Sequence, residues 1–218
     1  GTVLEPPTSS VFWVSPQGRL RTPALDNGVL ESITRDRLVK ALEVEEGDWP
    51  VADLEGVDEA RKVAIFSASI DTPLERRIYE VSYAKPATPK ALTPAGGWWT
   101  AKVAETGGAF TAGYSDPKTP PQMALYDATG KRVRWIEENR LAQGHPYWPY
   151  AATLPAPEFG TLTAANGEAL HYEILKPVGF DPAKKYPAIV SVYGGPHAQT
   201  VSRSWQKVGE RPYLEDGY

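Results

Sequence analysis

Tyr193 and the glycine pair that follows it are the residues best placed to do chemistry. They come at the end of Tyr186–Tyr193, an apolar run with a proline near its start, which predicts a buried central strand. In open α/β sheets ligands bind beyond the carboxyl ends of the strands, where a phenol and backbone amides can donate hydrogen bonds. Gly194 and Gly195 would let a reacting atom approach closely. A plain Gly-Gly-Pro turn after a core strand explains the same residues.

Few other side chains offer a nucleophile, a base or a metal ligand. The chain has no cysteine, which excludes a disulfide framework, a cysteine-ligated zinc site and a thiol nucleophile. The three histidines, His145, His171 and His197, are too few for a histidine cluster, and we interpret them as structural. No Gly-x-Ser-x-Gly sequence, the elbow that presents a serine nucleophile, occurs in the 218 residues. We therefore expect neither a metal site nor a complete triad.

Composition and charge exclude several classes of partner. The 23 Lys and Arg against 27 Asp and Glu give a net charge of −4, which does not favour nucleic acid or an anionic membrane surface. No run approaches the roughly 18 apolar residues of a membrane helix, and residues 1–7 lack the basic start and apolar core of an export signal. We expect a soluble protein with no nucleic-acid or membrane partner. The 19 Gly and 21 Pro, beside 7 Trp and 11 Tyr, favour turn-rich β structure.

The first 60 residues predict a small α+β segment. Two short apolar runs on either side of Ser15-Pro16-Gln17-Gly18 indicate a hairpin. Ser32 or Thr34 can cap a helix over Asp36–Glu45. Acidic residues crowd the stretch 43–59, which we expect to be an exposed, loosely structured boundary.

From Lys62 the hydrophobic period changes to two. Five short runs alternate in this way, and the Pro, Gly or Asp residues that follow them predict antiparallel strands of a meander. The predicted strands are Val63–Ser69, Arg77–Tyr83, Trp99–Ala104, Ala109–Tyr114 and Gln122–Asp127. Their spacing is typical of a propeller blade or a sandwich. One blade alone cannot bury both of its faces.

A proline-rich connector over residues 144–157 predicts an extended link between two domains, because proline stiffens the chain and disfavours helix. After it, Phe159–Thr163 and Ala169–Lys176 flank the pair Asn166 and Gly167, which indicates a second hairpin. The connector therefore divides a strand-rich region from a separate C-terminal part.

From about Lys62 to Tyr218 the sequence resembles the dipeptidyl peptidase IV branch of the prolyl oligopeptidase family of serine peptidases. The segments that carry the resemblance include DTPLERRIY (71–79), LTPAGGW (92–98), YSDPKTPPQ (114–122) and, most specifically, KPVGFDPAKKYPAIVSVYGGPHAQTVSRSW (176–205). In that family a propeller precedes an α/β-hydrolase domain. The resemblance implies propeller-blade strands over 61–143, a linker over 144–157 and the first strands of a hydrolase domain over 158–218.

The same resemblance implies roles for particular residues. Tyr193 would donate its hydroxyl to the oxyanion of the acyl-transfer intermediate formed from a peptide substrate. The Ser, Asp and His of the family's triad would follow in later regions, so we expect the 218-residue chain alone to be catalytically silent. The family holds the amino terminus of a substrate with two glutamates from an earlier propeller segment. Glu137 and Glu138 are not that pair, and we expect both to be solvated.

Residues 3–37 resemble the fold-type IV pyridoxal-phosphate enzymes, the class IV aminotransferases and aminodeoxychorismate lyases. A glutamate, a hairpin and a helix start, SITR (32–35), occur in that family's order. The resemblance implies that Glu5 pairs with the pyridinium nitrogen of the cofactor, and that Ile33 and Thr34 bind its phosphate. The family's Schiff-base lysine would precede Glu5 and is not among these residues. A capped helix start without a cofactor explains the same pattern.

Together these observations predict a mainly β protein with some α, an α+β fold. A partial propeller-blade meander would be followed by the first strands of an α/β-hydrolase sheet and preceded by the small α+β segment. The leading functional hypothesis is an incomplete serine dipeptidyl peptidase. One alternative is an interaction module or an artificial chimera, joined near residues 60 and 61, that self-associates through exposed strand edges. The other is a remnant pyridoxal-phosphate segment, and without it we expect no cofactor.

Overall fold

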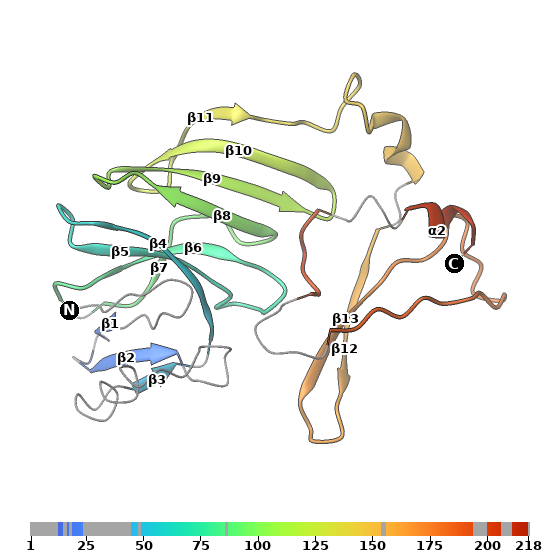
Figure 1. Cartoon of the computed structure of the whole chain (residues 1–218), viewed down its shortest axis with the longest axis horizontal. Helices are drawn as coiled ribbons and strands as arrows, with labels where there is room; N and C mark the ends of the chain where they lie inside the picture. The colour runs from blue at the N-terminus through green and yellow to red at the C-terminus, as the bar shows by residue number, and fades with distance from the viewer. Residues whose placement is uncertain are drawn as a thin grey trace.

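The computed structural model describes residues 13–14, 17, 19–23, 45–47, 49–85, 87–153, 156–193, 200–205 and 211–217. Within them, two four-stranded antiparallel sheets lie next to each other (Figure 1). The first sheet consists of β4 (Val51–Asp58), β5 (Val63–Ala68), β6 (Arg77–Ser82) and β7 (Lys90–Ala91). The second sheet consists of β8 (Trp98–Val103), β9 (Ala109–Asp116), β10 (Thr119–Asp127) and β11 (Arg132–Glu137). Each is an up-and-down meander, as in a propeller blade, so the predicted mainly β fold is confirmed.

The two sheets pack against each other through a shared apolar core. Ile65 and Ile78 of the first sheet are buried against Trp99, Phe110 and Tyr126 of the second. The rings of Phe110 and Tyr126 stack with centroids 5.3 Å apart, and Trp99 meets Tyr126 edge-on at 6.2 Å. Aromatic pairs in these arrangements stabilise a core beyond the area that they bury. The shared core thus covers one face of each sheet.

The opposite face of the first sheet carries a second apolar cluster. Phe66 and Tyr79 stack there with ring centroids 5.8 Å apart, and Trp49 stacks on Phe66 at 6.1 Å. Successive side chains of a strand point to opposite faces, so Ile65 and Phe66 enter different clusters. Ala64–Ala68 of β5 are consequently buried throughout.

The five strands predicted from the period of two are confirmed as β5, β6, β8, β9 and β10. The prediction that residues 43–59 are loosely structured is wrong, because β3 (Glu45–Gly47) and β4 lie within them. β4 pairs with β5 from Val51 opposite Ala68 to Asp58 opposite Val63. Pairing with a buried neighbour outweighs the low strand propensity of acidic side chains. The short β7 and the exposed β11 were not predicted.

The N-terminal elements form a small three-stranded sheet. β1 (Trp13–Val14) pairs antiparallel with β2 (Leu20–Pro23), which confirms the first hairpin, and β3 joins β2 in parallel. The helix predicted over Asp36–Glu45 lies outside the described residues except at its last position, which belongs to β3. The predicted junction near residues 60 and 61 falls in the turn between β4 and β5, which are paired strands. The first sheet therefore continues across that point.

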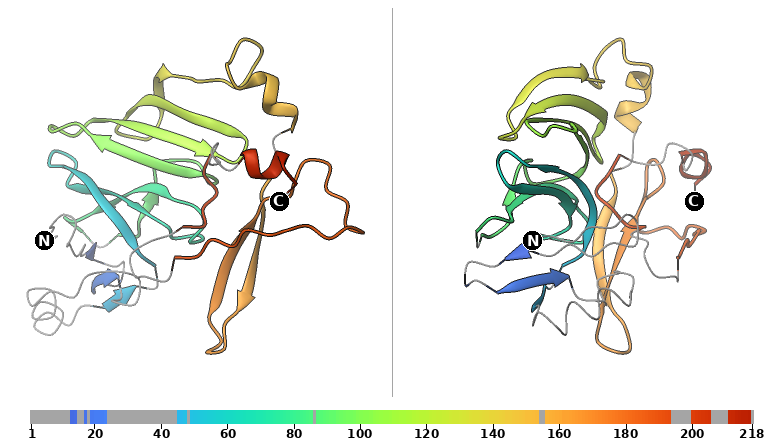
Figure 2. Two further views of the ribbon diagram at one scale, coloured as in Figure 1. Left: turned by 45° about the vertical axis from the view of Figure 1, so that its right-hand side comes forward. Right: turned by 60° about the vertical axis from the view of Figure 1, so that its left-hand side comes forward.

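Beyond the second sheet, the prediction of a fully extended connector is wrong for residues 148–153. They form a short 3-10 helix, η2 (Trp148–Thr153). Pro149 is tolerated near its start because the N–H that proline lacks would have no partner in the first turn. β12 (Glu158–Thr163) and β13 (Ala169–Ile174) then form the predicted second hairpin, which projects beside the two sheets (Figure 2). The link between two domains at 144–157 stays a prediction.

The buried strand predicted at Tyr186–Tyr193 is also wrong. The structure has no strand there, and Ile189, Val190 and Val192 are all exposed. A strand requires a hydrogen-bonded neighbour, and no strand of the described chain pairs with this segment. The short helix α2 (Arg211–Glu215) completes the described structure. No helix in the described ranges is long and apolar enough to cross a membrane.

Two adjacent glycines between β8 and β9 provide a matched test of how the sheets approach each other. Gly107 and Gly108 have positive φ angles of 71° and 76°, so alanine is strained by about 1 kcal/mol at either position. A Cβ on Gly107 would lie 2.6 Å from Cγ of Asp58, whereas a Cβ on Gly108 would meet nothing within 4 Å. We expect Gly107→Ala to lower the urea midpoint clearly more than Gly108→Ala. Equal midpoints would contradict the close approach of Asp58 to this turn.

Candidate active site

Tyr193 lies at the end of an extended segment, and the residue is 59% exposed. Its hydroxyl has no hydrogen-bond partner in the described part of the chain. Upstream, the Tyr186 hydroxyl accepts a hydrogen bond from the Asp181 N–H at 2.9 Å, and the Tyr186 ring contacts Phe180 with centroids 5.1 Å apart. Gly194 and the residues up to 199 lie outside the described residues. An exposed phenol of this kind can donate to an oxygen that gains negative charge.

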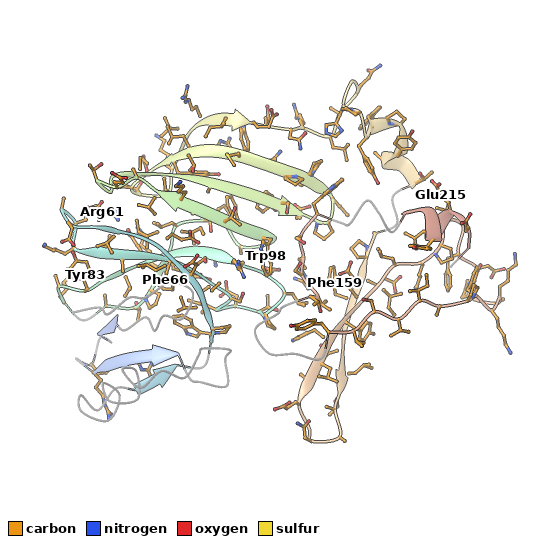
Figure 3. All side chains as sticks on the ribbon, in the orientation of Figure 1. Arg61, Phe66, Tyr83, Trp98, Phe159 and Glu215 are labelled. Carbon is orange, nitrogen blue, oxygen red and sulfur yellow. The ribbon has the colours of Figure 1, made fainter. Side chains whose placement is uncertain are left out.

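Downstream of Tyr193, residues 200–205, which we call the docking segment, lie against the ends of both sheets. Trp205 N–H donates to Ser115 Oγ at 3.2 Å, and Ser115 is paired with Trp98 in the second sheet. The ring of Trp205 meets Tyr147 of the connector edge-on, with centroids 5.7 Å apart. The docking segment passes between Trp98 and Phe159 in Figure 3. It therefore joins the sheets, the connector and the second hairpin.

Arg203 anchors the docking segment through its main chain and its side chain. Its N–H donates to the Leu74 carbonyl at 2.8 Å, and its Nη1 donates to Glu75 Oε1 at 2.7 Å. The other carboxylate oxygen, Glu75 Oε2, accepts the Gly96 N–H at 3.0 Å. The Arg203 guanidinium also lies over the Phe159 ring, 5.6 Å from its centroid. Arg203 thus contacts the turn before β6 and the strand β12.

Arg76 and Glu55 carry opposite charges and interact with each other. The guanidinium of Arg76 lies 4.4 Å from the centroid of Trp98, and its Nε is buried without a partner in the described chain. Burial lowers the pKa of Arg76, while the nearby carboxylate of Glu55 opposes this effect. Burial raises the pKa of Glu55, and the negative charge of Asp53 adds to the increase. Both groups therefore lose part of their ordinary preference for the charged form.

The two described histidines hold local structure. His145 Nδ1 accepts the Tyr147 N–H at 3.0 Å, and His145 Nε2 lies 2.9 Å from Asn139 Oδ1. His171 Nδ1 lies 3.4 Å from the hydroxyl of Thr161 on the paired strand. His197 lies outside the described residues. Glu137 and Glu138 are exposed, as predicted, and Glu137 accepts the Asn139 N–H.

The residues implied by the pyridoxal-phosphate resemblance, Glu5, Ile33 and Thr34, lie outside the described residues. Their cofactor contacts stay predictions. In the described ranges, no group of three His, Asp or Glu side chains could hold a metal ion.

The residues that hold the docking segment were not found from the sequence. Glu75 and Arg203 both lie in segments that carry the family resemblance, but 128 positions separate them. No local period or spacing signals a contact over such a distance in the chain. Only the fold brings this pair together.

The chain is similar in sequence to several known proteins. Residues 21–121 match the dipeptidyl peptidase IV (DPP IV) N-terminal region. The probable dipeptidyl peptidase 4 of Aspergillus flavus is 31% identical over 171 residues, which cover 77% of this chain and 22% of that protein. Dipeptidyl peptidase 8 of Mus musculus is 31% identical over 173 residues, which cover 74% of this chain and 19% of that protein.

Solved structures of dipeptidyl peptidases are also similar to this chain. A putative dipeptidyl aminopeptidase IV from Bacteroides ovatus matches with a TM-score of 0.65 and 33% identity, over 79% of this chain and 24% of that one. Dipeptidyl peptidase 4 from Porphyromonas gingivalis matches with a TM-score of 0.71 over 100% of this chain and 29% of that one. Its identity is 21%, so this second likeness concerns the fold alone.

The matches differ from our expectations at the N-terminus. The family match begins at residue 21 and includes Ile33 and Thr34, whereas we expected the resemblance to begin near residue 62. The comparisons give no support to the pyridoxal-phosphate resemblance, to an interaction module or to a chimera. The chain spans about a fifth of the length of the curated relatives that it matches. Over about three quarters of its length it is similar to dipeptidyl peptidases, and residues 21–121 match the DPP IV N-terminal region.

Proposed function

We propose that these residues act as part of a serine dipeptidyl peptidase, in which Tyr193 donates its hydroxyl to the oxyanion of the acyl-transfer intermediate. The observation that carries the proposal is the similarity to dipeptidyl peptidases, which reaches 33% identity for the Bacteroides ovatus structure and covers 79% of the chain. The proposed substrate is a peptide. The proposed blade-like sheets lie over residues 51–137, and the proposed hydrolase part begins at β12.

The chemistry of Tyr193 supports this assignment. When a serine attacks a peptide carbonyl, the carbonyl oxygen gains negative charge as the tetrahedral intermediate forms. A donor placed for that oxygen stabilises the transition state more than the bound substrate and therefore accelerates the reaction. The Tyr193 hydroxyl is exposed and has no partner in the described chain, so it is available to donate.

The nucleophile of the proposed reaction must come from elsewhere. The 218 residues contain no Gly-x-Ser-x-Gly elbow. Since the chain spans about a fifth of its curated relatives, we assign the nucleophile and its base to residues of a longer protein. These 218 residues would then supply the oxyanion donor and part of the scaffold.

The proposal is tested with the longest reading frame that contains these residues. We expect the purified product to release p-nitroaniline from Gly-Pro-p-nitroanilide, and the isolated 218-residue chain to release none. The matched control is the same substrate with an acetylated amino terminus, which a dipeptidyl peptidase should not cleave. The proposal fails if the longer protein cleaves neither substrate, and cleavage of only the acetylated substrate would assign it to another class of peptidase.

A further inference from the structure

We propose that Arg203 is a positioning residue for Tyr193: it fastens the docking segment, downstream of the tyrosine, to the turn before β6. This inference rests on the proposed function, because Tyr193 is the group to be positioned. The segment that ends at Tyr193 pairs with no strand of the described chain, so its position depends on where the chain is fixed on either side.

Described attachments lie on both sides of Tyr193 along the chain. Upstream, the hydrogen bond between the Asp181 N–H and the Tyr186 hydroxyl closes the preceding loop at 2.9 Å. Downstream, the docking segment carries the main-chain bond from Arg203 to Leu74 and the ion pair from Arg203 to Glu75. The downstream attachment joins this part of the chain to the turn before β6 of the first sheet.

The carboxylate of Glu75 is already held in the orientation that its ion pair with Arg203 requires. Its side chain is only 12% exposed, while that of Arg203 is 44% exposed. The Gly96 N–H holds Glu75 Oε2 at 3.0 Å, which leaves Oε1 directed at the guanidinium. A largely buried carboxylate requires a partner, since leaving such a charge unpaired is unfavourable. The carboxylate therefore selects a cation in the docking segment.

Two neighbouring contacts fix the orientation of the docking segment. The Arg203 guanidinium covers the Phe159 ring of β12, and Trp205 N–H bonds to Ser115 of β9 two residues later. Both sheets and the second hairpin thus hold the docking segment within three residues. Lysine could form the ion pair, but it could not reproduce the planar contact of a guanidinium with Phe159. We therefore expect Arg203→Lys to keep only part of the function.

The test measures hydrolysis of Gly-Pro-p-nitroanilide by the longer protein. Arg203→Met should lower kcat on the order of tenfold with little change in KM, because a displaced donor weakens only the transition state. In a Tyr193→Phe background the same substitution should have almost no further effect, since the group that it positions is gone. Arg134→Met, which removes an exposed arginine on β11, should leave kcat unchanged. Arg203→Lys should fall between Arg203→Met and the unsubstituted protein.

Three outcomes separate the possible failures. If the unsubstituted protein cleaves nothing, the proposed function fails. If it is active and Arg203→Met loses the same factor in both backgrounds, Arg203 acts independently of Tyr193 and the inference is overturned. Loss of thermal stability in Arg203→Met together with full activity of Arg203→Lys would also overturn it, because a general structural role would then suffice.

Discussion

Tyr193→Phe should lower kcat for Gly-Pro-p-nitroanilide by about 10² to 10³ in the longer protein, which is the loss expected on removing one oxyanion donor. The substitution removes a single hydroxyl and keeps the ring. Since the hydroxyl of Tyr193 has no described partner in the free protein, its removal breaks no described hydrogen bond of the fold. The loss should therefore appear in kcat with little change in KM or in thermal stability.

Tyr186→Phe is the matched control, because it removes a hydroxyl from the same extended segment. That hydroxyl accepts the Asp181 N–H, so its loss should reduce stability by about 1 kcal/mol without removing a donor to substrate. Equal losses of kcat in the two variants would show that both act through the path of the segment. Full activity of Tyr193→Phe would remove the oxyanion assignment altogether.

Strands with a regular apolar pattern could be predicted from the sequence, and irregular ones could not. β5 is a continuous buried run and β9 alternates in burial at its start, and each lies between two neighbours in its sheet. β4 carries Asp53 and Glu55 and a bulge, so its period of two is broken. It is a strand because its backbone pairs with β5. That tertiary requirement is absent from local propensity.

The opposite error arose at Tyr186–Tyr193. Its apolar run has the composition of a buried strand, but composition does not supply a neighbour, and the described chain offers none. The exposed Val190 and Val192 follow from the same lack of a neighbour. For the candidate site, Tyr193 could be named because its glycine pair is local in sequence. The pair of Arg203 and Glu75 could not, because only the packing of the docking segment on the sheets creates it.

Asp58 is the other position where a single substitution should have a large effect. Its side chain is 3% exposed and links the turn after β4 to the turn between β8 and β9. The carboxylate accepts the Arg61 N–H at 2.9 Å, the Arg61 Nε–H at 3.1 Å and the Gly108 N–H at 3.1 Å. One buried carboxylate therefore satisfies donors from both sheets.

Asp58→Ala should reduce the free energy of unfolding by about 3 kcal/mol at pH 7, because it leaves the partly buried N–H groups of Arg61 and Gly108 and the Nε–H of Arg61 without their acceptor. Urea unfolding of the 218-residue chain measures this change. Asp127→Asn is the comparison, since the described hydrogen bonds that the Asp127 side chain accepts come from its own turn, from Thr129 and Lys131. We expect a smaller loss there. Similar losses at both positions would mean that Asp58 contributes nothing between the sheets.

The effect of Asp58 should depend on pH in a defined direction. The Arg61 N–H, followed by the Gly108 N–H and the Arg61 side chain, lowers the pKa of Asp58 below its usual 3.8 in the folded chain, against the opposing effect of burial. A carboxyl whose pKa is lower when folded stabilises the fold fully above its unfolded pKa, and this stabilisation is lost as the pH falls through the folded pKa. The difference in unfolding free energy between the unsubstituted chain and Asp58→Asn should therefore be constant from pH 7 to pH 5 and shrink below about pH 4. A difference that persists unchanged to pH 2 would show that the charge of Asp58 contributes nothing, and that its shape and hydrogen bonds alone join the two sheets.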